Sequence, residues 1–197
     1  MAERRLSRAR LLKGAALAGG GALTSGLALG AAPEPAVSRG SARQDVEILN
    51  LVLLFEHVQS QFYADALKTA KLQGDLLDFA QVLAGQEQEH LEFVRKALGA
   101  KARPLPALDF GGAVTDPGRF ADTALKLEDL GVAAYNAQAP NLTPGTLAAA
   151  AKIVSVEARH AAWIRDIAGQ NPAPDAAEPV ASPERVMQTL RGSGFIK

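Results

Sequence analysis

Apolar residues recur every three or four positions along most of the chain, which is the period of an α-helix that buries one face. Proline and glycine divide this pattern into four long segments, which predict helices over residues 45–73, 75–98, 119–139 and 141–170. The stretch between Gly99 and Gly118 is rich in proline and glycine and is too long to be a tight turn. Two helices, one long connection and two further helices predict an all-α four-helix bundle with one long crossover between helices 2 and 3.

Acidic residues interrupt the apolar face of every predicted helix: Glu56, Glu87, Glu128 and Glu157. On the third helix, for example, Glu128 falls in line with Ala121 and Leu125. No Lys or Arg falls on the four apolar faces to pair with these acids. An ionised carboxylate in a bundle core costs several kcal/mol unless it is compensated, so the pattern predicts a bound cation.

The second half of the chain repeats the first. A histidine follows three residues after the second glutamate of each half, at His90 and at His160. The spacing from Glu56 to Glu87 nearly equals the spacing from Glu128 to Glu157, and Tyr63 and Tyr135 occupy matching places after the first glutamates. Glutamate and histidine at i and i+3 project from one face of a helix, so each Glu-x-x-His can serve one site. The chain is therefore interpreted as a duplicated helical pair.

One glutamate from each of two helices and a Glu-x-x-His from each of the other two resembles the ligand set of ferritin-like di-iron or di-manganese carboxylate proteins. The resemblance covers approximately residues 45–168. It implies a ferritin-like bundle that binds two Fe ions, or two Mn ions, with Glu87 and Glu157 bridging the metals and Tyr63 and Tyr135 close by as candidate catalytic residues. The implied metal ligands are Glu56, Glu87, His90, Glu128, Glu157 and His160.

The N-terminal residues 1–38, which have the character of an export leader, the opening "ILNLVLLFEHVQSQFY" and the motif "EARHAAWI" resemble the ferritin-like family that includes desiccation-associated proteins. This resemblance implies an oxidoreductase that acts on Fe(II), O2 or H2O2 and protects against oxidative or drying stress. Two alternatives remain open. One is peroxide dismutation like that of manganese catalase, and the other is a non-catalytic stress-associated bundle that serves as a structural element or metal buffer. Packing within the bundle is likewise the alternative role for the two tyrosines.

The composition excludes several kinds of metal site, catalysis and partner. The chain has no cysteine, which excludes disulfides, zinc ribbons, thiolate-ligated iron and thiol catalysis, so any metal must be held by oxygen and nitrogen ligands. Lys and Arg together number 21, as do Asp and Glu, for a formal net charge of +0. Since the charges are scattered, we expect no nucleic-acid partner. A single chain does not reveal its assembly, and a homo-oligomer remains open.

The N-terminal residues have the character of an export signal. Arg4 and Arg5 open a basic stretch that resembles a twin-arginine leader, and an uncharged run follows from Ala15 to Ala32. We therefore expect an exported, periplasmic or otherwise extracytoplasmic protein that contacts a membrane only if the leader stays uncleaved. The predicted organisation is a leader over residues 1–38, the bundle over residues 39–170, and a Pro/Ala-rich tail over residues 171–197 with a short helix after Ser182.

Overall fold

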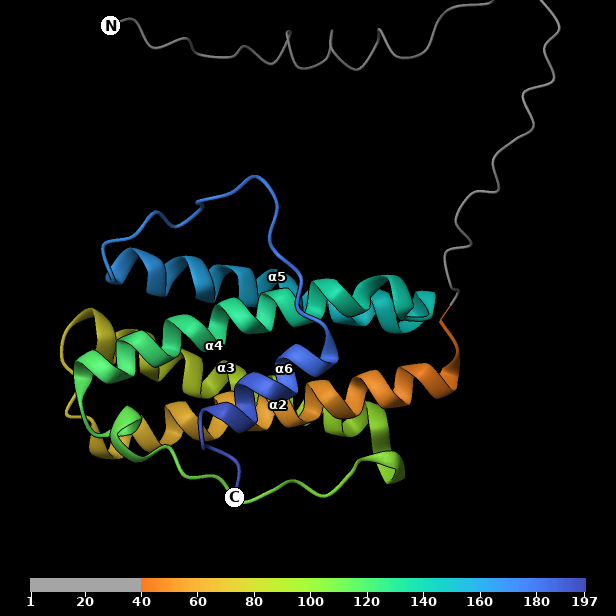
Figure 1. The fold of residues 1–197 in the computed structure, drawn as a ribbon, viewed down its shortest axis with the longest axis horizontal. Coiled ribbons are helices and arrows are strands. Elements are labelled where there is room, and N and C mark those ends of the chain that lie inside the picture. Colours follow the sequence, from red (N-terminus) through yellow and green to blue (C-terminus); the bar gives the residue numbers. More distant parts are fainter. Residues whose placement is uncertain (1–39) are drawn as a thin grey trace, which may run out of the picture. The chain divides into compact units, whose positions relative to one another are not determined.

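Four long helices make up the bundle, and a fifth, shorter helix follows them (Figure 1). The computed structural model describes residues 40–197. The predicted leader, residues 1–38, lies outside the described residues. The long helices are α2 (Ala42–Thr69), α3 (Asp75–Leu98), α4 (Pro117–Gln138) and α5 (Pro144–Ile167), and the short one is α6 (Pro183–Gly192). The prediction of an all-α bundle with one long crossover is confirmed.

Local sequence signals set the ends of these helices. The Ser41 hydroxyl caps α2 by accepting from the Gln44 N–H at 3.2 Å, and the Asp116 carboxylate caps α4 by accepting from the Arg119 N–H at 2.8 Å. Gly74 and Gly99 bound α3 with φ of 55° and 53°, a region that glycine enters without a steric penalty. Side-chain caps therefore start α2 and α4, and glycines bound α3.

Helices α2 and α5 differ from the predicted segments at their ends. The first helix ends at Thr69, so the residues up to Gln73 form part of the connection to α3. The fourth helix begins only at Pro144, because Ala139–Asn141 form a separate 3-10 turn, η3. It ends at Ile167, two residues before Gly169, whose φ is 69°.

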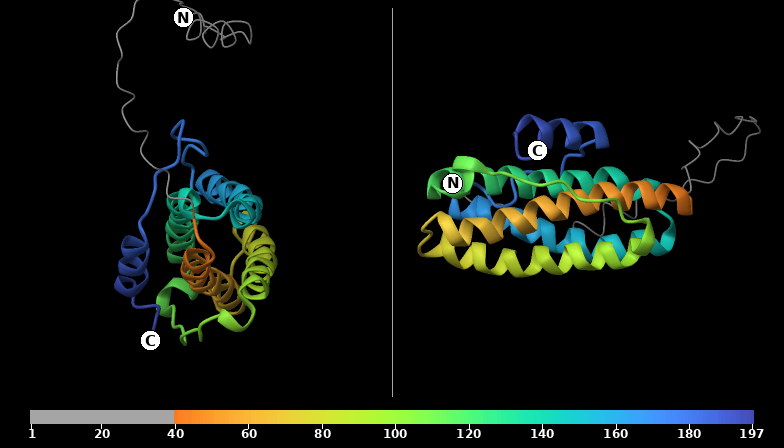
Figure 2. Two further views of the ribbon diagram at one scale, coloured as in Figure 1. Left: turned by 90° about the vertical axis from the view of Figure 1, so that its right-hand side faces the viewer. Right: turned by 90° about the horizontal axis from the view of Figure 1, so that it is seen from below.

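The helices pack as two pairs. The most extensive contacts join α2 to α3 and α4 to α5, and each pair is connected by a short loop, so its members run antiparallel (Figure 1). The crossover runs along the bundle from α3 to α4 and contains two 3-10 turns, η1 (Gly99–Lys101) and η2 (Gly111–Val114) (Figure 2). The crossover thus returns the chain so that the second pair can face the first.

Two apolar clusters fill the interior. The larger cluster is rich in aromatic rings, with Phe62 stacked on Phe120 at a centroid distance of 5.3 Å. The smaller cluster includes Ile48 from α2, Val94 from α3 and Ile153 from α5. Along α3 and α5, the inward glutamates Glu87 and Glu157 fall between the positions that supply the two clusters. The acids therefore lie in the middle of the bundle, with apolar layers on both sides.

The C-terminal residues fold back onto the bundle. Helix α6 lies beside α2 and α4, and its Val186 and Leu190 are 0% and 1% exposed (Figures 1 and 2). The Ala181 N–H donates to the Ala133 carbonyl of α4 at 2.9 Å, and the Asp109 N–H of the crossover donates to the Phe195 carbonyl at 2.9 Å. This segment holds the crossover and α4 together from outside.

Within residues 40–197, no helix combines the length and apolar character needed to cross a membrane.

Candidate metal centre

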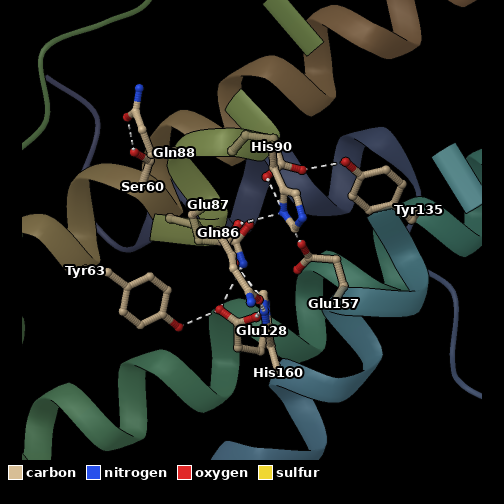
Figure 3. Close-up of polar contacts among 12 residues, drawn as sticks. Ser60, Tyr63, Gln86, Glu87, Gln88, His90, Glu128, Tyr135, Glu157 and His160 are labelled. Carbon is tan, nitrogen blue, oxygen red and sulfur yellow. Dashed lines mark hydrogen bonds and ion pairs between the residues drawn. The ribbon is translucent and has the colours of Figure 1, made fainter. Parts of the chain in front are cut away.

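The six residues that the sequence proposed as metal ligands lie together in the middle of the bundle (Figure 3). They come from all four long helices, and the four glutamates are each 0% exposed. The side chain of His160 is 4% exposed and that of His90 is 11% exposed. His90 is therefore the member of the cluster nearest to solvent.

The two histidines occupy opposite ends of the group of carboxylates. Nδ1 of His90 lies 2.9 Å from Glu157 Oε1, 3.3 Å from Glu87 Oε2 and 3.6 Å from Glu56 Oε2. Nδ1 of His160 lies 3.0 Å from Glu87 Oε1 and 3.5 Å from Glu128 Oε2.

These atoms form two overlapping groups that could each hold a metal ion. In each group one atom per residue lies within 4.8 Å of all the others. The first group is Glu56, Glu87, His90 and Glu157, and the second is Glu87, Glu128, Glu157 and His160. Glu87 and Glu157 belong to both groups, which is the placement that bridging carboxylates require.

The donor atoms of this cluster fit a metal ion because most of them lack a protein partner. Within residues 40–197, the buried atoms without a hydrogen bond include Glu56 Oε2, Glu87 Oε1, Glu128 Oε2, both oxygens of Glu157, and His160 Nδ1. Buried polar atoms are nearly always satisfied in folded proteins, so this many orphans in one place needs an explanation. Carboxylate oxygens and imidazole nitrogens are ligands that iron and manganese accept.

The tyrosines connect the two halves of the bundle. The Tyr63 hydroxyl of α2 donates to Glu128 Oε1 of α4 at 2.5 Å, and the Tyr135 hydroxyl of α4 donates to Glu56 Oε1 of α2 at 2.5 Å (Figure 3). Each hydroxyl holds one oxygen of a glutamate that belongs to a single metal group and leaves the other oxygen without a protein partner. The tyrosines therefore orient these two carboxylates besides packing in the core.

Two glutamines at the centre were missed by the sequence reasoning. The Gln59 amide, which is 0% exposed, donates from Nε2 to Glu128 Oε1 at 2.9 Å. Oε1 of Gln86 lies 2.6 Å from His160 Nε2 and accepts a hydrogen bond from it. Gln59 follows Glu56 by one helical turn, so its place on the inward face of α2 was the available signal.

Burial and mutual repulsion set the protonation of the acids. Burial raises the pKa of Glu56 to about 7, and the charge of Glu87 pushes it in the same direction. Burial likewise raises the pKa of Glu128, and it raises that of Glu157 well above its ordinary value. Burial also penalises the charge of Glu87, but the adjacent imidazoles of His160 and His90 hold the pKa of Glu87 below its ordinary value.

The carboxylates stabilise the charged form of both histidines. Burial opposes the imidazolium of His90, but the close approach of the Glu157, Glu56 and Glu87 carboxylates outweighs it and raises the pKa of His90 to about 12. At His160 the same competition with Glu128 and Glu87 raises the pKa to about 10. Four carboxylates nevertheless exceed what two imidazoliums can neutralise. The cluster must therefore take up protons or bind cations.

Neighbouring residues of similar type lie outside the cluster. His57 points to the crossover, where its Nε2 is 3.1 Å from the Pro106 carbonyl oxygen. Glu89 is exposed on the outer face of α3. Trp163 packs edge-on against Phe79 with their centroids 5.3 Å apart. None of the three belongs to either group of potential ligands within the described residues.

The comparisons agree with this architecture. The model of one protein family, described as the ferritin-like domain, matches residues 44–170. That range contains all four long helices and all six residues of the cluster. No curated protein matches the sequence.

Proposed function

The chain belongs to the ferritin-like domain family, and from this premise we propose that it binds two iron or two manganese ions and acts as an oxidoreductase on Fe(II), O2 or H2O2. The observation that carries the proposal is the pair of overlapping ligand groups, with buried donor atoms that no protein group satisfies. Two bound ions of this kind supply two-electron redox chemistry with O2 or H2O2.

Charge balance supports two divalent ions. Four carboxylates against two such ions form a formally neutral centre, which removes the repulsion that raises the pKa values of Glu56, Glu128 and Glu157. A histidine binds a metal only through an unprotonated nitrogen, so His90 and His160 must release their protons when the ions enter. Metal binding is therefore coupled to proton release.

The protein environment contributes orientation and exclusion of water. Tyr63 and Tyr135 fix one oxygen of Glu128 and of Glu56, so the other oxygen of each carboxylate faces the nearby histidine. The two apolar clusters shield the carboxylates from water on both sides along the bundle. A dry, shaped cavity with preset ligands is what the protein supplies to a redox-active metal pair.

A direct test compares the purified parent with Glu56→Ala and His160→Ala, and uses the exposed-site variant Glu89→Gln as the matched control. Each protein is loaded anaerobically with Fe(II) and mixed with O2 or H2O2, and oxidation of Fe(II) is followed by absorbance. The parent and the control are expected to oxidise Fe(II) much faster than buffer, and both ligand variants are expected to be strongly impaired. If both ligand variants fold and oxidise Fe(II) as fast as the parent, the proposal is wrong. Rapid H2O2 turnover by Mn-loaded parent alone indicates the catalase-like alternative.

We propose in addition that the protein is exported and takes part in protection against oxidative or drying stress. The support is the basic, then uncharged character of residues 1–38 and the resemblance of "EARHAAWI" and the preceding segments to desiccation-associated proteins. Export predicts that the mature protein from the extracytoplasmic fraction begins after the leader. N-terminal sequencing tests this, and an intact Met1 in a cytoplasmic fraction contradicts it.

A further inference from the structure

The two halves of the centre are not equivalent. Ligands and tyrosines occur in matching pairs, but the glutamines do not. Gln59 stands three residues after Glu56, whereas Gly131 stands three residues after Glu128. Gln86 directly precedes Glu87, whereas the apolar Val156 precedes Glu157. Gln59 and Gln86, both in the first half of the chain, therefore have no glutamine counterpart in the second half.

Gln59 adds a second donor to one carboxylate. Oε1 of Glu128 accepts from the Tyr63 hydroxyl at 2.5 Å and from the Gln59 amide at 2.9 Å, whereas Oε1 of Glu56 accepts from the Tyr135 hydroxyl at 2.5 Å. Gln59 is 0% exposed and its own Oε1 has no hydrogen-bond partner in the described structure. Burying an unsatisfied amide oxygen costs about 1–3 kcal/mol. Stability alone does not account for a glutamine here, but its bond to Glu128 does.

Gly131 leaves the space that this amide uses. A Cβ at this position would lie 2.9 Å from Phe55 Cε1, 3.3 Å from Glu157 Oε2 and 3.6 Å from Gln59 Nε2. The equivalent position on α4 therefore has no room for a second glutamine. The geometry admits one amide, and that amide is directed to Glu128.

Gln86 fixes the histidine of the same side. Because Oε1 of Gln86 accepts from His160 Nε2 at 2.6 Å, the other ring nitrogen, Nδ1, is left to face the carboxylates, where it is buried without a partner. Nε2 of His90 makes no hydrogen bond within residues 40–197, and the His90 side chain is 11% exposed against 4% for His160. One imidazole is held in the orientation that binds a metal, and the other is less constrained.

We propose that the position built on Glu128 and His160 binds its divalent ion more tightly than the position built on Glu56 and His90, so that the two ions load in sequence. Gln59 and Gln86 are the positioning residues that cause the difference. This inference rests on the two-metal centre proposed above. Groups that orient a metal ligand from behind typically change metal affinity by about 10–100-fold. The less constrained and more exposed His90 position is then the one that exchanges its ion with solution.

Anaerobic titration of the metal-free full-length protein with Co(II) tests this, with heat and visible absorption as the readouts. We expect two binding steps in the parent whose affinities differ by about 10-fold or more. His160→Ala should remove the tighter step and His90→Ala the weaker one. Gln59→Leu and Gln86→Leu should each weaken the tighter step by about 10–100-fold. Gln61→Leu on α2 and Gln88→Leu on α3 are the controls. Gln61 bonds to Asp65, and Gln88 bonds to Ser60 and Glu92, so neither glutamine contacts a proposed metal ligand.

Glutamate substitutions separate positioning from packing. Gln86→Glu retains an oxygen that accepts from His160 Nε2, so the tighter step should remain. Gln59→Glu replaces the donor to Glu128 with a second anion, so the tighter step should weaken. If the two glutamines only fill space, Gln59→Glu and Gln86→Glu should affect the tighter step equally. Two steps of equal affinity, or glutamine variants that bind Co(II) like the parent, would overturn the inference and leave the two-metal centre intact. A folded parent that binds no Co(II) would overturn both.

Discussion

Replacing Glu157 with glutamine should stabilise the metal-free protein and at the same time destroy metal binding. Glu157 is 0% exposed, both of its oxygens lack a hydrogen bond, and burial together with the charges of Glu87, Glu56 and Glu128 raises its pKa well above 4.5. His90, 2.9 Å away, retains Glu56 and Glu87 as partners after the substitution. The variant therefore removes surplus negative charge without leaving the imidazolium unpaired.

The gain follows from the cost of burying Glu157. An unfolded glutamate is ionised near pH 7, whereas burial and the neighbouring carboxylates disfavour the charged form of Glu157 in the folded, metal-free protein. Folding must therefore bury an unfavourable charge or take up a proton, and either one lowers the stability of the metal-free protein. A buried amide offsets part of the gain, so Glu157→Gln should raise the free energy of unfolding by about 1–3 kcal/mol. For a chain of this size that is roughly 2–4 °C in melting temperature per kcal/mol.

Urea unfolding of the metal-free proteins measures this gain, and titration with Fe(II) or Mn(II) measures the loss of binding. Glu89→Gln, on the exposed face of α3, is the matched control and should change stability by less than about 0.5 kcal/mol. A stabilised variant that no longer binds two ions is the behaviour of a residue retained for function. If Glu157→Gln instead destabilises the metal-free protein by several kcal/mol, the cluster is a structural ion-pair network and the reasoning is refuted.

Three further outcomes are expected. The metal-free protein should lose stability as pH rises from 4.5 to about 7, because the unfolded chain releases the proton of Glu56 at lower pH than the folded chain does. Urea unfolding across this interval should show a fall in the free energy of unfolding that Glu56→Gln reduces and metal loading abolishes. A free energy of unfolding that does not change with pH would contradict the raised pKa of Glu56. Tyr135→Phe removes the donor to Glu56 Oε1 and should weaken one metal-binding step by about 10-fold, whereas unchanged binding in a calorimetric titration would leave Tyr135 with a packing role. Leu190→Ala, at a residue 1% exposed on α6, should cost about 2–5 kcal/mol in urea unfolding without changing metal content; an unaltered stability would mean that α6 does not pack on the bundle in solution.

The period of the apolar residues was sufficient to predict the bundle. Helical segments with inward glutamates, separated by Gly74, by the Pro/Gly-rich crossover and by Pro140, leave few alternatives to two antiparallel pairs. On α4, the buried face differs in part from the apolar face that the sequence predicted. Ala121 and Leu125 are only half-buried, whereas Ala124 and Leu127 are buried. The reason is that α4 also faces α6, whose Val186 and Leu190 share its apolar cluster.

The partners of the tyrosines could not be read from the sequence. Tyr63 shares a face of α2 with Glu56, but seven residues of helix span about 10 Å, which is too far for a hydrogen bond between them. The structure shows instead that Tyr63 reaches Glu128 and that Tyr135 reaches Glu56. Such contacts depend on how the two pairs face each other, and periodicity within one helix carries no information about that arrangement.

The glutamines were missed for a related reason. Glutamine is common on solvated helix faces, so neither Gln59 nor Gln86 stands out by residue type. Gln59 does lie on the inward face of α2, and the contrast with Gly131 at the equivalent place in the second half was visible in the sequence. What the sequence lacks is the distance from Gln59 to Glu128 across the bundle, which makes the contrast meaningful.

The number of metal ions bound per chain tests the central claim most directly. The parent protein and the double variant Glu87→Ala/His160→Ala are loaded anaerobically with Fe(II) or Mn(II), freed of unbound metal and measured by elemental analysis, and circular dichroism verifies that both are helical. We expect about two Fe or Mn ions per parent chain and a loss of this metal in the folded double variant. A folded, helical parent that retains no metal after loading would contradict the proposed centre and leave a ferritin-like bundle without its ions.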